Sequence, residues 1–318
     1  MNLKIRDRIF DWGKRTYIMG ILNVTPDSFS DGGEFNSVEK ALSQARDMLN
    51  NGVDIIDIGG ESTRPHAAAV SVEEELERVI PVITKLRQES SIPISIDTTK
   101  AIVAQKAIAA GANIVNDISG ATFDEEMLNT VEQLDIPLIL MHIRGNPKTM
   151  QSMTDYDDVV TEVIEFLEAQ VNKAIACGIS KSRIIVDPGI GFAKTANQSL
   201  ELLQRLDELK VLNLPMLVGV SRKSFMRPIL NKDKAKDRVW GTAAACYGVI
   251  ARGADILRVH DVAQIYDVCR VADAIERNFI REYTSTCEPL TKLVQTYKGT
   301  TINERSRLSK YCFSLCVS

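Results

Sequence analysis

The chain has 318 residues, of which 45% are hydrophobic and 25% are charged, which is ordinary composition for a folded protein. Its formal net charge of −4 argues against a nucleic-acid binder that depends on overall positive charge. No apolar stretch is long enough to span a bilayer, and residues 1–12 lack the apolar core of a signal peptide. We therefore expect a cytoplasmic protein that binds neither nucleic acid nor membrane.

The six cysteines are scattered, without the spacing of a zinc site or a disulfide framework. Most of them are expected to be buried thiols or exposed tail residues in a reducing compartment. Cys312 and Cys316 could form a metal or redox pair in the tail, but such sites usually need more ligands.

In chain order, residues 1–16 predict a short β-hairpin with a turn near 11–14. The apolar run Ile18–Leu22 then predicts a buried strand, and the polar stretch that follows to Gly33 predicts a loop. From this point strands and helices alternate. The strands are predicted at 18–22, 54–58, 92–97, 112–117, 137–142, 183–189, 214–221 and 254–260. The helices are predicted at 38–50, 72–88, 100–110, 124–134, 156–177, 198–209, 239–253 and 262–277. Ser37 is a possible N-cap of the first helix, and Ser71 with Glu74 has the spacing of a capping box.

Eight strand-plus-helix units in about 250 residues match a closed (β/α)₈ TIM barrel. A doubly wound open sheet is the competing architecture, but the chain shows no composition break or second domain that would favour it. We expect an N-terminal hairpin over 1–16, a (β/α)₈ barrel domain over 17–282 and a C-terminal extension of unknown structure over 283–318.

The predicted strand ends are nearly all polar, and in such a barrel the C-terminal strand ends meet at one mouth, where the active site lies. In chain order they are Asn23; Thr63 and Arg64; Asp97; Asn116 and Asp117; Met141 and His142; Asp187; Ser221, Arg222 and Lys223; Arg258 and His260.

Three of these residues, Asp97, Asn116 and Asp187, can accept hydrogen bonds from a flat, nitrogen-rich heterocycle with an amino-pyrimidinone edge. Asp97 or Asp187 could instead cap a helix or form an internal ion pair, and Asn116 could bond neighbouring backbone.

A second group is typical of an anion site. It contains Arg64, Lys223, Arg258 and His260, with Asn23 and Thr63 beside them. The Asn23 carbonyl oxygen is a hard ligand for Mg²⁺, and an ion held by so few protein groups is expected to arrive with the substrate. The glycine-rich G-I-G-F-A-K at 189–194 lacks the third glycine of a dinucleotide fingerprint and the G-K-S/T of a Walker loop.

The motifs together resemble the dihydropteroate synthase family of pterin-binding enzymes. They are M-G-I-L-N-V-T-P-D-S-F-S-D-G-G, G-G-E-S-T-R-P, S-I-D-T-T-K, N-D-I-S-G, M-H-I-R-G-N-P-K-T-M, D-P-G-I-G-F-A-K, G-V-S-R-K-S-F and R-V-H-D-V. They occur in the family's order over roughly residues 17–280.

The resemblance implies a barrel that joins 6-hydroxymethyl-7,8-dihydropterin diphosphate to 4-aminobenzoate with Mg²⁺ as cofactor, through a dihydropterin carbocation. It implies a pterin site of Asp97, Asn116, Met141, Asp187 and Lys223, and a diphosphate site of Asn23, Thr63, Arg64, Arg258 and His260, with Asn23 as the metal ligand. It implies an aminobenzoate site of Phe29, Pro65, Phe192 and Ser224, where sulfonamides compete. Asp31, Asp97, Asp187 and Lys223 would be catalytic.

In the implied reaction the loops 27–33 and 63–69 close to exclude water from the cation. The resemblance also implies a homodimer formed through the helices around 239–253 and 262–277. Two departures from the family stand out. His66 occupies a position where many relatives have glycine, and 283–318 has no counterpart.

Two other functions stay open. A pterin-barrel methyltransferase would share the pterin-facing residues but does not need the cationic group. A catalytically silent paralogue that binds pterin or a partner protein would be expected to lose residues from the first loop or the anion site, and none is missing.

Overall fold

The barrel predicted from the sequence is present. The computed structural model describes residues 2–25, 34–62 and 69–277. Eight parallel strands pair in the order β8-β7-β6-β5-β4-β3-β10-β9, and a parallel bridge between Val186 and Met216 joins β8 to the start of β9. The predicted boundary at 282 and the extension 283–318 lie outside the described residues.

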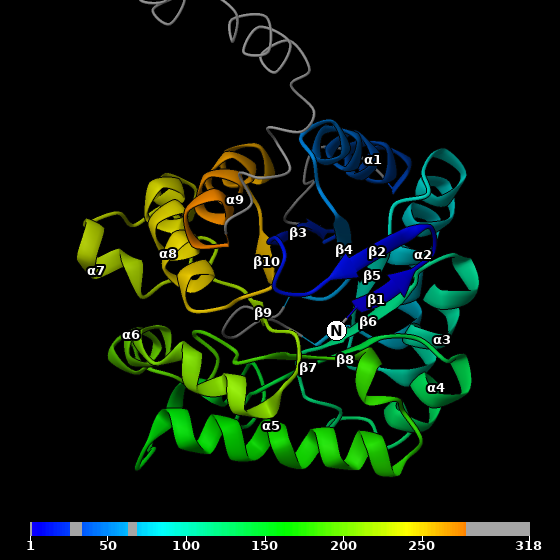
Figure 1. Cartoon of the computed structure of the whole chain (residues 1–318). Coiled ribbons are helices and arrows are strands. Elements are labelled where there is room, and N and C mark those ends of the chain that lie inside the picture. Colours follow the sequence, from blue (N-terminus) through cyan, green and yellow to red (C-terminus); the bar gives the residue numbers. More distant parts are fainter. Residues whose placement is uncertain (1, 26–33, 63–68, 278–318) are drawn as a thin grey trace, which may run out of the picture. The chain divides into compact units, whose positions relative to one another are not determined.

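The barrel strands are β3 (Tyr17–Asn23), β4 (Ile55–Gly59), β5 (Ile94–Asp97), β6 (Ile114–Asp117), β7 (Leu138–Met141), β8 (Ile184–Asp187), β9 (Leu217–Val218) and β10 (Ile256–Val259). The helices are α1 (Glu34–Asn50), α2 (Val72–Glu89), α3 (Ala101–Ala110), α4 (Met127–Leu134), α5 (Val159–Ala176), α6 (Ala196–Gln204), α7 (Met226–Leu230), α8 (Val239–Ala251) and α9 (Val262–Glu276). They surround the strands (Figure 1). The strands are buried almost throughout, because helices cover their outer faces and side chains fill the interior. Among the described residues no helix is long and apolar enough to cross a bilayer.

Several predicted boundaries are wrong. Helix α1 begins at Glu34, so Ser37 lies inside its first turn and cannot be the N-cap. The helix predicted at 198–209 ends at Gln204, and a 3₁₀ helix, η4 (Leu206–Leu212), completes the connection. The long strand predicted at 214–221 contains only the two residues of β9.

The capping box predicted at Ser71 is half formed. The Ser71 hydroxyl accepts a hydrogen bond from the backbone N–H of Glu74 at 3.2 Å. The Glu74 carboxylate instead forms an ion pair with Arg78, one turn further along the helix. A reciprocal box does cap α6, between Thr195 and Gln198.

The N-terminal hairpin closes one end of the barrel. Its strands β1 (Asn2–Ile5) and β2 (Arg8–Asp11) pair antiparallel and lie across that end in Figure 1. Leu3, Ile5 and Phe10 pack against the inward-facing residues at the beginnings of the barrel strands. The hairpin turn is at residues 6–7, where Arg6 has φ +57°. The turn predicted at 11–14 exists, but it connects the hairpin to β3.

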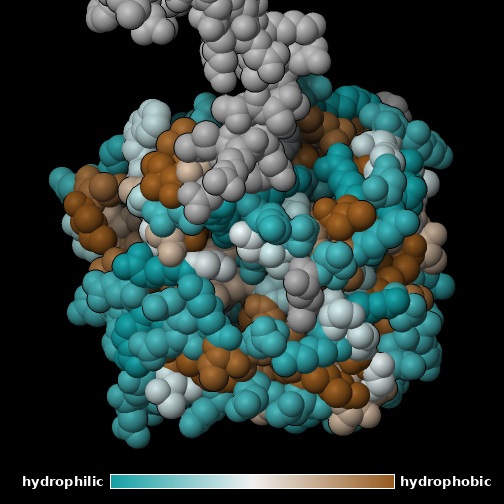
Figure 2. Space-filling view, viewed as in Figure 1, coloured by the Kyte–Doolittle hydropathy of each residue, from teal (hydrophilic) through white to brown (hydrophobic). Residues whose placement is uncertain are grey.

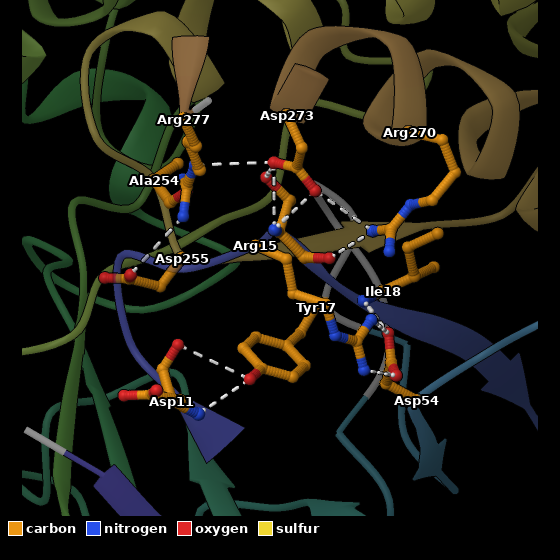
Figure 3. A network of polar contacts seen from close by, with 11 residues as sticks. Asp11, Arg15, Tyr17, Ile18, Asp54, Ala254, Asp255, Arg270, Asp273 and Arg277 are labelled. Atoms are coloured by element: carbon orange, nitrogen blue, oxygen red, sulfur yellow. Dashed lines mark hydrogen bonds and ion pairs between the residues drawn. The ribbon is translucent and has the colours of Figure 1, made fainter. Parts of the chain in front are cut away.

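A polar network ties the same end together (Figure 3). The fully buried carboxylate of Asp273 on α9 accepts hydrogen bonds from the backbone N–H of Thr16 at 2.8 and 3.0 Å, and from its hydroxyl at 2.7 Å. Arg270 and Arg277 flank it. Asp54 accepts from Arg15 at 2.6 Å and from the N–H of Ile18 at 2.9 Å. These contacts anchor β3 to its neighbours at the end opposite the mouth.

Candidate functional site

Alternation along the strands divides the barrel interior into a closed end and a mouth. An apolar residue faces inward near the start of a strand, and the side chain two positions later faces the mouth. The pairs are Ile55 and Asp57, Ile114 and Asn116, Ile139 and Met141, Ile185 and Asp187, and Ile256 and Arg258. The apolar residue of each pair fills the interior at the closed end. The second residue, which is polar in every pair except that of Met141, lines the mouth.

Arg258 lies at the centre of the mouth. Its Nε donates to Asp57 Oδ2 at 2.6 Å, and its Nη2 donates to Asp97 Oδ2 at 2.5 Å. The Asn116 side-chain amide donates to the same Asp57 oxygen at 3.1 Å. Side chains from β10, β4, β5 and β6 thus meet in one network. Asp97, Asn116 and Arg258 lie together at the strand ends, as the sequence analysis predicted.

Burial and charge act against each other in this network. Burial alone would lower the pKa of Arg258, but the carboxylates of Asp57 and Asp97 raise it above its ordinary value. Burial raises the pKa of Asp97 to about 7, against the attraction of Arg258. Arg258 therefore stays charged, and it is paired with the carboxyl groups of both Asp57 and Asp97.

Asp187 and Lys223 form a second group on the other side of the mouth. Burial raises the pKa of Asp187, while a hydrogen bond of 2.8 Å from the N–H of Gly189 opposes the shift. Burial lowers the pKa of Lys223 to about 8, against the attraction of Asp187. The Lys223 ammonium lies 4.3 Å from the centre of the Phe192 ring, within range of a cation–π contact. Lys223 can therefore change its protonation near neutral pH.

His260 does not contribute positive charge. Burial, together with the smaller effects of nearby Arg222 and Arg258, lowers its pKa to about 3. Its Nδ1 lies 2.9 Å from the Ser221 hydroxyl, and Arg222 is paired with Asp261 at 2.5 Å. His260 is therefore neutral here, and its ring can form hydrogen bonds to an anion.

The remaining predicted residues divide into three kinds. Met141 is buried with Phe192 packed against its cluster, so both border the same interior space. Ser224 is exposed, and Asn23 is partly exposed at the end of β3. Phe29, Asp31, Thr63, Arg64, Pro65 and His66 lie outside the described residues.

A pocket of about 310 Å³ opens beside this network. Asp97 and Ile118 border it on the barrel side, and the loop residues Asn146 to Lys148 border it on the outside. Lys100 also lines it and binds Glu61 and Glu75 at 2.5 and 2.6 Å. Asp97 belongs to both, so the pocket adjoins the Arg258 network at this residue.

The sequence interpretation missed two residues here, Asp57 and Lys194. Asp57 lies inside the predicted strand 54–58, and its inward orientation follows from period-two alternation with Ile55. Lys194 belongs to the G-I-G-F-A-K motif, which the sequence analysis excluded as a nucleotide-binding loop without giving Lys194 a role. It is buried against His142 at 2.9 Å, and no periodicity predicts a contact between two loops.

The Asn23 side chain offers one hard oxygen, and no group of three His, Cys, Asp or Glu side chains among the described residues could hold a metal ion. This donor set fits Mg²⁺ only if the ion takes most of its ligands from substrate phosphates and water.

Comparison with known proteins adds three findings. The family model described as "Pterin binding enzyme" matches residues 19–260. A dihydropteroate synthase from Synechocystis is 60% identical over 275 residues, which cover 86% of this chain and 95% of that protein. Two solved structures of Xanthomonas albilineans dihydropteroate synthase each cover 86% of this chain. The one with 4-aminobenzoic acid is 43% identical, with a TM-score of 0.81 and 97% of its own chain covered. The one in complex with 7,8-dihydropteroate is 40% identical, with a TM-score of 0.79 and 98% covered.

Proposed function

This chain belongs to the pterin binding enzyme family, and we propose that its barrel mouth catalyses the reaction of the dihydropteroate synthases to which it is similar. This transferase reaction of folate biosynthesis joins 6-hydroxymethyl-7,8-dihydropterin diphosphate to 4-aminobenzoate and releases 7,8-dihydropteroate and diphosphate. The observation that carries the proposal is the convergence of Asp97, Asn116, Asp187 and Lys223 on the inward face of one barrel mouth.

The pterin ring would bind in the interior of the mouth. Its amino-pyrimidinone edge carries neighbouring N–H groups, and the oxygens of Asp97, Asn116 and Asp187 can accept hydrogen bonds from them. Met141 supplies an apolar wall, and Lys223 can donate to a ring acceptor. Since Arg258 already bonds Asp97 at 2.5 Å, that carboxylate enters the complex oriented by an existing hydrogen bond.

The diphosphate would lie nearer solvent, against Asn23, Arg258 and His260. Bound Mg²⁺ would neutralise part of the charge that develops on the leaving diphosphate, with Asn23 as its protein ligand. Arg258 contributes fixed N–H donors, and neutral His260 contributes a ring hydrogen bond. Thr63 and Arg64, which follow Glu61 in the chain, are proposed as further diphosphate ligands.

Bond formation would need little base catalysis. As the C–O bond to diphosphate breaks, the electron pair leaves with the diphosphate oxygen, and the methylene cation is delocalised into the pterin ring. The amine of 4-aminobenzoate then donates its lone pair to the methylene carbon and afterwards loses one proton to solvent or to the departing diphosphate. Asp97 and Asp187 stabilise the cation electrostatically. Phe192 and Ser224, with Phe29 and Pro65, would hold the ring of 4-aminobenzoate, and Asp31 would join them from the first loop.

A homodimer through α8 and α9 is also proposed. Trp240 is 71% exposed on α8, and Val271 and Ile275 are 60% and 61% exposed on α9. Figure 2 shows apolar surface over α9 and over neighbouring α7, where Ile229 is 59% exposed. Large exposed apolar residues on neighbouring helices are typical of a protein interface.

The test is incubation of the purified chain with the pterin diphosphate, labelled 4-aminobenzoate and Mg²⁺. The proposal expects labelled 7,8-dihydropteroate in amounts that grow with time and enzyme. The Asp187→Ala variant gives the background signal. A wild-type signal no higher than this background would refute the proposal. Transfer of a methyl group from a folate to a corrinoid would instead favour the methyltransferase alternative, which the named relatives argue against.

A further inference from the structure

Lys194 is a buried amine in the loop 188–195, between β8 and α6. Only 4% of Lys194 is exposed to solvent. Its Nζ lies 3.1 Å from the carbonyl oxygen of Gly189, 2.9 Å from that of Phe192 and 2.9 Å from Nδ1 of His142. Lys194 therefore bonds its own loop at two points and the end of β7 at a third.

The loop has an unusual backbone shape. Gly189, Gly191 and Ala193 have φ values of +66°, +78° and +50°, a region that glycine adopts readily and a residue with a side chain, such as Ala193, adopts rarely. A Cβ atom at Gly189 would lie 2.0 Å from the carbonyl oxygen of His142, so the loop is pressed against the end of β7. Such a conformation persists only when surrounding contacts hold it.

This shape orients two residues of the mouth. The N–H of Gly189 bonds Asp187 Oδ1 at 2.8 Å, and the N–H of Phe192 bonds the carbonyl oxygen of Gly189 at 3.0 Å. The Phe192 ring in turn lies 4.3 Å from Lys223 Nζ. Lys194 therefore binds the carbonyl groups of Gly189, whose N–H bonds Asp187, and of Phe192, whose ring contacts Lys223.

The two bonds to the loop do not depend on the protonation of Lys194. An ammonium has three N–H donors for its three neighbours, and a neutral amine has two for the carbonyl oxygens while accepting from an Nδ1–H of His142. His142 itself is neutral, because burial and then Lys194 lower its pKa to about 2. The contact therefore acts as a permanent brace and not as a pH switch.

We propose that Lys194 is a positioning residue that fixes the loop 188–195, so that Phe192 meets the aromatic amine and Asp187 meets the pterin. Lys194 does not touch substrate, and it acts through the backbone of Gly189 and Phe192. This inference rests on the proposed function for the role of Phe192, whereas the bracing of the loop can be measured without activity.

The test compares Lys194→Met, which keeps the length of the side chain and removes its donors, with Lys181→Met. Lys181 is exposed in η3 (Lys181–Arg183), the short helix just before β8, so it controls for the loss of one lysine near the same strand. Hydrogen exchange of peptides covering 188–195 is measured first, in the absence of substrates. Lys194→Met is expected to speed it by about tenfold or more, and Lys181→Met is expected to leave it unchanged.

Steady-state kinetics and pterin binding provide the second measurement. Lys194→Met is expected to raise KM for 4-aminobenzoate by about tenfold, through Phe192, and to raise the Kd of a pterin ligand as well, through Asp187. Unchanged exchange in 188–195, or wild-type affinity for both ligands, would overturn the proposal. If wild-type protein makes no product, the proposed function fails, and hydrogen exchange alone decides whether Lys194 braces the loop.

Should Lys194→Met not fold, Lys194→Gln takes its place. Its amide keeps a donor but ends short of the position of Nζ, so faster exchange and a raised KM for 4-aminobenzoate are again expected. Wild-type values for both would overturn the proposal.

Discussion

Arg258 and Asp57, which are 201 residues apart in the chain, lie 2.6 Å apart between Nε and Oδ2 inside the barrel mouth. Asp57 is fully buried, and its second oxygen, Oδ1, has no hydrogen-bond partner among the described residues. The same Oδ2 also accepts from Asn116. One carboxylate therefore orients both a proposed diphosphate ligand and a proposed pterin ligand.

Asp57→Asn should lower kcat/KM by about 10- to 100-fold, because Arg258 loses one of its two anionic partners and can turn away from its position. Steady-state kinetics with both substrates measure this loss. The matched control is Asp54→Asn, just before the same strand, where the carboxylate binds Arg15 and Ile18 at the closed end. That control should lower the unfolding temperature without changing either KM. Equal kinetic effects of the two variants would contradict the role given to Asp57.

Lys223 should give the reaction an alkaline limit. With its pKa lowered to about 8 by burial, the ammonium loses its proton above that pH, and kcat/KM should fall. Lys223→Arg keeps the charge at every accessible pH, so its profile should lack this limb even if its maximum is lower. A limb that persists at the same pH in Lys223→Arg would assign it to another group.

The same shift has a consequence for stability. The folded protein binds this proton less tightly than the unfolded chain does, because the folded pKa lies below the ordinary value of 10.5. Protonation therefore favours unfolding, and the contribution of Lys223 should make the protein more stable as the pH rises from about 8 to 10.5. Urea titrations of wild type and Lys223→Met across this range measure the difference. A wild-type midpoint that falls relative to that of the variant would contradict the sign.

Asp273 should matter for stability and not for chemistry. Asp273→Asn weakens the hydrogen bonds from Thr16 and the ion pairs with Arg270 and Arg277, at an expected cost of about 2–4 kcal/mol of unfolding free energy. Chemical denaturation measures this cost, and kcat/KM of the folded fraction should not change. Asp267→Asn on the exposed side of the same helix should change the unfolding free energy by less than about 0.5 kcal/mol.

The proposed dimer predicts that Trp240→Lys and Val271→Lys produce monomers in sedimentation experiments, since each places a charge on an apolar face of α8 or α9. Ile9→Lys, at a 63% exposed position of the N-terminal hairpin, should leave the assembly unchanged. A wild-type protein that is monomeric at micromolar concentration would refute the proposal outright.

The sequence by itself determined the barrel, its eight units and the identity of most mouth residues. Buried parallel strands appear in the sequence as apolar runs, and the polar residues at the ends of these runs mark the C-terminal edge of the barrel. Asp97, Asn116, Asp187 and Arg258 could therefore be placed at that edge from the local pattern alone. The family motifs added the substrates and the named reaction.

Only the tertiary structure decided how these groups are paired and charged. Charged residues that are far apart in the chain form ion pairs when their strands are neighbours in the barrel. Arg258 is paired in this way with Asp57, 201 residues away, and with Asp97. Desolvation depends on everything packed around a group, so His260 became neutral and the pKa of Lys223 moved toward neutrality. Lys194, to which the sequence analysis gave no role, has its proposed role because the loop after β8 folds onto the end of β7.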